Sequence, residues 1–231
     1  MIVTCYYDIY NNGNFLKYLE LFSTLGNSGI SIILFTDPAF VSSFSFPNVT
    51  VIGVSLETFE LYSIGIKYNG SLPSNRNQYK DTKEFLSLMN SKIEFIKRAS
   101  ETVNDDTFLW IDFGILKIVK NTDCFIKKLK LINEMTFTKI KMPGCWEFKS
   151  PYSDDYVNWR FCGGFFAIPR HHIDTFYSHS KNILTDLCTL PQKKLTWETN
   201  VWYIIEYGMA KDIIDWYSAD HNDSIILNLD I

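Results

Sequence analysis

The chain has 231 residues and carries 22 basic and 26 acidic side chains, a net charge of -4 with histidine neutral. Proteins that wrap nucleic acid or coat an anionic membrane need a basic face, so this balance argues against both partners. With 46% hydrophobic and 21% charged residues, the composition is that of a globular protein with a sizeable core. We predict a single domain over residues 1–231 and no nucleic acid partner.

The N-terminus and the cysteines bear on the compartment. No basic segment precedes an apolar run at the start, and no stretch of about 18 apolar residues follows later. Five cysteines are present without a CxxC pair: Cys5, Cys124, Cys145, Cys162 and Cys188. We expect a cytoplasmic protein, of a bacterium or of a virus in its host, with reduced thiols, no integral membrane segment and no zinc.

The first third of the chain alternates strand and helix. Strand-like runs at 2–9, 30–35 and 49–54 and a helical pattern at 15–25 predict a βαβ unit followed by a third strand. Residues 63–80 are rich in Asn, Gly, Ser and Pro without periodicity, which predicts a long functional loop.

One long helix and a buried strand are predicted next. Asp81 to Glu84 has the pattern of a capping box, in which Asp81 accepts from the backbone NH of Glu84. Apolar residues then follow a three-four spacing as far as Val103. The run 108–115 is apolar and aromatic except for Asp112, so it predicts a buried fourth strand.

The second half of the chain is less regular. It predicts helices at 121–134, 170–187 and 196–207, the last with Thr196 as N-cap, and strands at 137–142, 161–168 and 213–217. An aromatic and acidic loop at 146–159 separates the first two of these strands. Gly163 and Gly164 fall inside the strand 161–168, where paired glycines let another backbone or a sugar approach closely.

Asp112 is the first candidate site residue. An acid at the carboxyl end of a parallel strand lies where α/β proteins bind ligands, and it can hold a metal or a ribose. The alternative is an acid that caps a neighbouring turn. Asp112-Phe113-Gly114 also spells the magnesium motif of protein kinases, but the glycine-rich loop, strand lysine and catalytic loop of a kinase are missing from the sequence.

The polar stretch after the last strand supplies further candidates. Asp220 or Asp223 and the imidazole of His221 could complete a metal site with Asp112. The alternative is a surface turn, which Asp and Asn favour.

A predicted helix start supplies a second carboxylate. Glu198 lies in the first turn, where the helix dipole keeps it ionised, which suits a general base and an ordinary first-turn acid equally. Trp197 beside it could stack on a sugar or lie in the core. Arg76 and Lys80, in the loop before the long helix, and Lys92 on it predict a phosphate cradle, with solvated loop charge as the alternative.

Taken together, these segments resemble the HtrL/YibB (WlaTC-like) family of glycosyltransferases. The similar blocks are Val3–Tyr7, Lys80–Leu86, Met89–Lys92, Trp110–Ile115, Gly163–Phe166, Thr196–Asn200 and Ala219–Ser224. The resemblance implies a GT-A-like nucleotide-diphospho-sugar transferase fold, an α/β fold with a mixed central sheet flanked by helices. Residues 1–115 would bind the nucleotide sugar and residues 116–231 the acceptor.

The resemblance also implies an activity, the transfer of a sugar from a nucleotide-diphosphate sugar to a hydroxyl of a glycan or glycoprotein, in surface glycan synthesis. Asp112 and Glu198 would be catalytic, and a divalent cation, Mn²⁺ or Mg²⁺, would be held by Asp112, Asp220, His221 and Asp223. The substrate-binding residues would be Arg76, Lys80, Asp81, Asn90, Lys92, Gly163, Gly164, Trp197, Asn200 and Asn222. The chain departs from the family's DxD motif at Gly114, which replaces the second acid.

Two choices stay open at the level of the sequence. Glu198 would accept the acceptor's proton if the reaction inverts configuration, whereas the leaving phosphate would do so if it retains configuration. A non-catalytic nucleotide-sugar or glycan-binding protein on the same fold would tolerate the missing second acid. A metal-dependent phosphohydrolase ranks third, because its usual paired His and Asp clusters are missing from the sequence.

Overall fold

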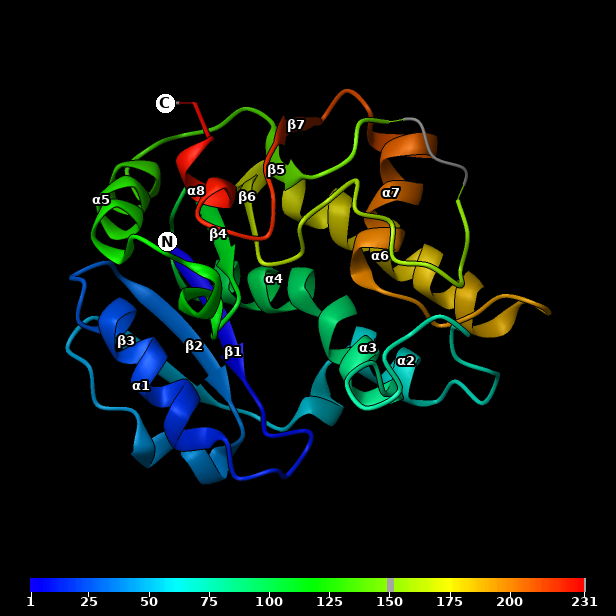
Figure 1. The fold of residues 1–231 in the computed structure, drawn as a ribbon, viewed down its shortest axis with the longest axis horizontal. Helices are drawn as coiled ribbons and strands as arrows, with labels where there is room; N and C mark the ends of the chain where they lie inside the picture. Colours follow the sequence, from blue (N-terminus) through cyan, green and yellow to red (C-terminus); the bar gives the residue numbers. More distant parts are fainter. Residues whose placement is uncertain (149–151, 231) are drawn as a thin grey trace.

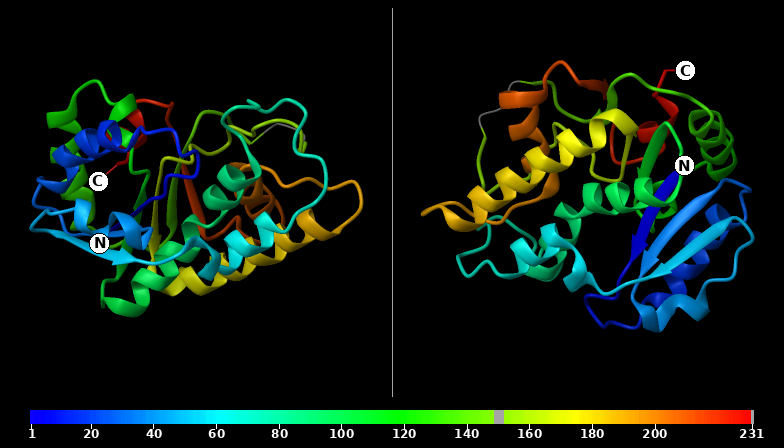
Figure 2. Two further views of the ribbon diagram at one scale, coloured as in Figure 1. Left: turned by 90° about the horizontal axis from the view of Figure 1, so that it is seen from below. Right: turned by 180° about the vertical axis from the view of Figure 1, so that it is seen from behind.

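A mixed seven-stranded sheet lies between two layers of helices in the computed structural model, which describes residues 1–148 and 152–230 (Figures 1 and 2). The strand order is β3-β2-β1-β4-β6-β5-β7, and only β6 runs antiparallel to its neighbours. The strands are Ile2–Tyr6 (β1), Ile32–Thr36 (β2), Val49–Gly53 (β3), Thr107–Ile111 (β4), Ile140–Gly144 (β5), Phe165–Pro169 (β6) and Ile214–Ser218 (β7). The predicted α/β fold with a mixed central sheet flanked by helices is confirmed.

Each face of the sheet carries its own hydrophobic core. One core packs against α1, α5 and α8, and the other packs against α2, α3, α4, α6 and α7. The helices are Phe15–Gly26 (α1), Glu60–Ile66 (α2), Lys83–Asn90 (α3), Lys92–Thr102 (α4), Thr122–Asn133 (α5), Arg170–Thr189 (α6), Glu198–Ile205 (α7) and Ser224–Leu227 (α8). Among the described residues, no helix has both the length and the hydrophobicity that crossing a membrane requires.

The carboxyl ends of the parallel strands lie at one edge of the sheet, which we call the carboxyl edge. All five residues of β1, β2, β4 and β6 are buried, as expected of strands covered on both faces. The six strands that share one direction all end at the carboxyl edge. Asp112 follows β4 there, Cys145 follows β5 and Ala219 follows β7, while β6 begins there after Gly164.

The predicted long helix is wrong in one respect, since the structure has two helices, α3 and α4, that meet at Ser91. Side-chain hydrogen bonds accompany the break. The Ser91 hydroxyl donates to the carbonyl of Ser87, and the Asn90 amide donates to the carbonyls of Leu86 and Thr196. Such bonds compete with the regular helical pattern.

The predicted capping box is also wrong. Thr82 is the N-cap of α3, and its hydroxyl oxygen accepts from the backbone NH of Phe85 at 3.3 Å. Asp81 serves the preceding turn instead, because its Oδ2 accepts from the backbone NH of Asn77 at 3.0 Å.

Three other boundaries differ from the sequence-based expectations. The loop predicted for residues 63–80 was placed too early, because residues 63–66 belong to α2. Thr196 does not cap α7, because its hydroxyl donates to the carbonyl of Asp154, and Trp197 occupies the N-cap position. Gly163 and Gly164 precede β6 instead of lying inside it. The predicted loop 146–159 includes residues 149–151, which lie outside the described residues.

Candidate active site

A buried lysine lies at the centre of the carboxyl edge. The Nζ atom of Lys92, on the first turn of α4, lies 2.9 Å from Oδ1 of Asp112 and 2.8 Å from Oε1 of Glu198. It also donates to the carbonyl oxygen of Gly163 at 2.8 Å. The side chain of Lys92 is 1% exposed, that of Glu198 7% and that of Asp112 36%. Asp112 is therefore the member of this cluster that a ligand can reach.

The two carboxylates of the cluster keep Lys92 positively charged. Burial by itself lowers the pKa of Lys92, but Asp112 and Glu198 more than reverse this effect, so the pKa lies above its ordinary value. Lys92 therefore remains an ammonium ion. One positive and two negative groups leave the cluster with a net charge of -1.

Trp110 fixes the orientation of Asp112. Its indole Nε1 donates to Oδ1 of Asp112 at 2.8 Å. Among the described residues, the side-chain partners of Asp112 are thus Trp110 and Lys92, and both use Oδ1. This arrangement leaves Oδ2 for a ligand.

The two glycines before β6 explain how these side chains approach one another. A Cβ atom on Gly163 would lie well under 3.0 Å from Oε1 of Glu198, closer than real Cβ atoms come. A Cβ atom on Gly164 would lie 2.9 Å from Cδ1 of Ile115 and 3.8 Å from Oδ2 of Asp112. The close approach expected of paired glycines is present, and at Gly163 the approaching group is Glu198.

A pocket of about 590 Å³ lies where β5 and β7 end, and Lys92, Asp112 and Glu198 are not among its lining residues. Its lining includes two tryptophans and several polar groups from the segments after β5, before β6 and after β7: Cys145, Trp146, Trp159, Asp220, His221, Ser224 and Asn228. Trp146 is 42% exposed, and the rings of His221 and Trp159 form a T-shaped pair with centroids 4.4 Å apart. The pocket thus offers aromatic surface next to hydrogen-bonding groups, which is typical of ligand sites.

His221 couples the pocket electrostatically to the lysine cluster. Although part of the His221 side chain is exposed, partial desolvation of the ring lowers its pKa, and the positive charge of Lys80 lowers it further, whereas the negative charges of Asp220, Glu198 and Asp112 oppose the shift. The net pKa is below its ordinary value, so His221 is neutral near pH 7.

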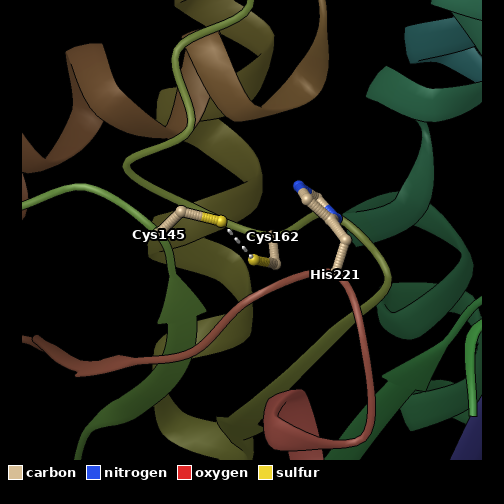
Figure 3. Close-up of side chains that lie close together, drawn as sticks. All are labelled: Cys145, Cys162 and His221. Atoms are coloured by element: carbon tan, nitrogen blue, oxygen red, sulfur yellow. Dashed lines mark hydrogen bonds between the residues drawn. The ribbon is translucent and has the colours of Figure 1, made fainter. Parts of the chain in front are cut away.

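Two thiols and His221 form a compact group, of which Cys145 and His221 line the pocket and Cys162 is buried (Figure 3). The Sγ atoms of Cys145 and Cys162 are 3.5 Å apart, and one ring nitrogen of His221 lies within 4.8 Å of both. The Cys145 thiol donates to Oδ1 of Asp220 at 3.7 Å. Burial raises the pKa of both thiols.

The four residues predicted to hold Mn²⁺ or Mg²⁺ do not fit a common ligand set. Among the described residues, the compact group of metal-ligating side chains is the one with the two cysteines, and it contains neither Asp112 nor an aspartate of the 220–223 stretch. Asp223 uses its two oxygens to accept from the backbone NH groups of Lys120 and Asn121 before α5. Lys92 places a positive charge beside Asp112, where the cation was expected.

Several predicted substrate-binding residues are occupied in holding the fold. Asn90 joins α3 to the segment before α7, and Asp81 holds the turn at Asn77. Asn200 is fully buried, with its amide donating to Ser153, Tyr156 and Thr196 and its oxygen accepting from the NH of Asn158. Trp197 lies in the core, and Asn222 accepts from the NH of Ser224 in the turn after β7.

The two loop cations differ in their surroundings. Lys80 is exposed, lies 5.0 Å above the Phe85 ring and acts electrostatically on His221. Arg76 donates through Nη1 to the carbonyl of Pro73, and its buried Nε has no hydrogen-bond partner among the described residues. Of the two cations, Lys80 is therefore the one that acts electrostatically on a residue lining the pocket.

The sequence analysis missed three contributors to this edge. Trp110 could have been found, because residues two apart on a strand share a face and Trp110 precedes Asp112 by two. Cys145 and Cys162 could not have been paired from the sequence, because their proximity depends on β5 and β6 lying side by side.

Comparisons with known proteins give only distant likenesses. No protein-family model matches the chain, and no curated protein matches it. A glycosyltransferase involved in the glycosylation of the major capsid of PBCV-1 is 11% identical, with a TM-score of 0.42, covering 95% of this chain and 80% of that chain. The glycosyltransferase GlyE of Streptococcus pneumoniae TIGR4 is 12% identical, with a TM-score of 0.46, covering 94% of this chain and 44% of that chain.

A third solved structure belongs to another kind of enzyme. Bifunctional IspDF from Campylobacter jejuni is 9% identical, with a TM-score of 0.42, covering 95% of this chain and 49% of that chain. The chain thus spans less than half the length of GlyE and of IspDF. At these identities and TM-scores the likenesses carry no argument about function, and membership of the HtrL/YibB family stays a prediction.

Proposed function

We propose that this protein is a glycosyltransferase that moves a sugar from a nucleotide-diphosphate sugar to a hydroxyl of a glycan or glycoprotein, in surface glycan synthesis. The observation that carries the proposal is the position of Asp112. It follows β4 at the carboxyl edge, is partly exposed and is held by a buried lysine. In open α/β sheets ligands bind outside the carboxyl ends of the strands.

Asp112 would contact the donor directly. Lys92 and Trp110 hold its Oδ1, so Oδ2 can accept a hydrogen bond from a hydroxyl of the donor sugar. Lys92 is too deeply buried to touch a substrate, and its role is that of a positioning residue. A carboxylate fixed in this way needs little reorganisation when the substrate arrives.

The buried state of Glu198 bears on the two possible stereochemical courses. Glu198 is bonded to Lys92 and lies behind Gly163, which supports a role in holding the lysine. In a retaining course the leaving phosphate takes the acceptor's proton, and Glu198 only positions other groups. In an inverting course the acceptor hydroxyl would have to reach Glu198 beside Gly163.

Lys80 would stabilise the leaving diphosphate. Its exposed ammonium is close enough to His221 to lower the pKa of that residue, which places it within electrostatic reach of the pocket. Electrostatic stabilisation of a developing charge is usually the largest single contribution to catalysis. Of the four predicted ligands, we still propose only Asp112 to bind Mn²⁺ or Mg²⁺. No step of this mechanism depends on that cation.

The proposal can be tested with a panel of nucleotide sugars. Thermal shifts with UDP, GDP and CMP would first identify the donor base, and nucleotide release would then be followed with candidate acceptors. We expect one donor class to bind and to release its nucleotide only when an acceptor is present. Binding without release would favour the non-catalytic alternative, and hydrolysis of phosphoesters that lack a sugar would favour a phosphohydrolase.

A further inference from the structure

The cluster of Cys145, Cys162 and His221 has a chemistry that the proposed transfer reaction does not use. The three side chains come from three segments, namely the end of β5, the residues before β6 and the loop after β7 (Figure 3). Cys162 is buried, Cys145 is partly exposed and His221 is exposed. Solvent can therefore enter the group from the pocket side.

The distances suit a tetrahedral metal site. Zinc binds thiolates at about 2.3 Å, which separates two sulfur ligands by roughly 3.8 Å. The two Sγ atoms are 3.5 Å apart, and the nitrogen of His221 lies within 4.8 Å of both, so a shift of roughly 1 Å would complete the geometry. The same sulfur separation is much longer than a disulfide bond of about 2.05 Å, and both cysteines are free thiols.

We propose that Cys145, Cys162 and His221 form a Zn²⁺ site with three protein ligands and a fourth position open to the pocket. Thiolate sulfur is a soft ligand and imidazole nitrogen is an intermediate one. Such a ligand set selects zinc over the hard cations Mn²⁺ and Mg²⁺. Three protein ligands with an open position are typical of zinc sites that bind water or a substrate atom. The absence of a CxxC pair is no obstacle, because the fold brings the two cysteines together.

The site would also brace the lysine cluster. Cys162 directly precedes Gly163, whose carbonyl accepts from Lys92. Zinc would therefore tie this backbone to the end of β5 and to the loop after β7. The inference does not depend on the proposed transferase activity, because its readouts are metal binding and thiol protection.

The test uses the whole chain, freed of metal by a chelator and kept reduced with a phosphine. We expect one Zn²⁺ per chain, and we expect Co²⁺ to give a thiolate-to-metal charge-transfer absorption. Zinc should protect Cys145, the partly exposed thiol of the group, from alkylation, as peptide mass spectrometry would show, whereas the buried Cys162 reacts slowly in either state. Mn²⁺ at the same concentration should not protect Cys145.

Variants identify the ligands. Cys145→Ser and His221→Gln should each weaken zinc binding by roughly 100-fold or more, since even changes around a metal ligand weaken binding by about 10- to 100-fold. His221 is exposed, so His221→Gln tests the site even if Cys145→Ser folds poorly. Cys124→Ser changes an exposed cysteine outside the group and should bind zinc like the unmodified chain. Absence of the charge-transfer band, or unchanged zinc affinity in His221→Gln, would overturn the proposal.

Discussion

The ammonium group of Lys92 lies 2.9 Å from Oδ1 of Asp112, with 1% of the lysine side chain exposed. A lysine this deeply buried needs partners for its charge, and it has two carboxylates and the carbonyl of Gly163. The pair joins the start of α4 to the end of β4, so it holds the candidate catalytic carboxylate against the layer of helices.

Replacing Lys92 by Met should therefore destabilise the protein strongly. The change leaves Glu198 buried without its counter-ion, and breaking a buried ion pair from one side costs about 3–5 kcal/mol. The loss would be measured as the change in the free energy of unfolding in urea. Lys97→Met is the matched control, because Lys97 lies on the same helix and its ion pairs are largely exposed, worth about 1 kcal/mol or less. Equal effects of the two changes would contradict the account.

The second prediction concerns Gly163. A methyl group there would collide with Oε1 of Glu198, and overpacking of this kind costs about 1–3 kcal/mol. We expect Gly163→Ala to lower the melting temperature and to reduce any transferase activity. Gly208→Ala is the control, since its added Cβ would meet no described atom within 4 Å apart from its own chain neighbours and the adjacent helix backbone. A Gly163→Ala protein as stable as the control would show that Glu198 is not held as described.

The third prediction is a pH dependence that arises from Asp155. Lys194, at 2.7 Å, and Ser74 bond to this carboxylate, and these bonds lower its pKa from 3.8 to about 2. Because the folded-state pKa is the lower one, the stabilisation is fully present above 3.8 and is lost as the pH falls towards about 2.

Urea unfolding of the unmodified chain and of Asp155→Asn over this range would check the prediction. The two proteins should differ most in stability above the ordinary pKa of Asp155 and should converge as the pH falls. A difference that stays constant with pH would mean that the Asp155 carboxylate gains nothing from Lys194 and Ser74.

The fourth prediction concerns Trp146 in the pocket. Stacking of the donor's base on an aromatic side chain is worth about 1–3 kcal/mol, so Trp146→Ala should raise the KM for the donor by roughly 5- to 150-fold. The kcat should change little, because such a contact is the same in the ground state and the transition state. Leu131→Ala, an exposed apolar change on α5, is the control. A fall in kcat at constant KM would place Trp146 in another role.

The sheet could be predicted from the sequence because its strands are apolar and short. The strand before Asp112 was recognisable from its composition, and the mixed sheet with flanking helices followed from the resemblance. The break between α3 and α4 could not be predicted, since Asn90 there bonds to the carbonyl of Thr196, 106 positions away.

The candidate site was predicted in part. Asp112 lies at the carboxyl edge as the strand pattern predicted, and Lys92 and Glu198 were both named without any indication that they touch. Their contact spans 106 positions and requires the glycine at 163. Within the part of the chain that the structure describes, Asp112, Asp220 and Asp223 do not belong to a compact group of metal-ligating side chains. Asp223 holds the chain before α5, a tertiary contact that its local sequence does not reveal.

The most direct test of the central claim is the rate of nucleotide release from the best donor, with acceptor present, by the unmodified chain and by Asp112→Asn. Lys92 keeps Glu198 as a partner in this variant, so the fold should persist, as thermal unfolding would verify. Asp186→Asn, an exposed change on α6, is the control. We expect a loss of roughly 100-fold or more in kcat/KM for Asp112→Asn alone, equivalent to about 2.7 kcal/mol. A variant as active as the unmodified chain would contradict the account.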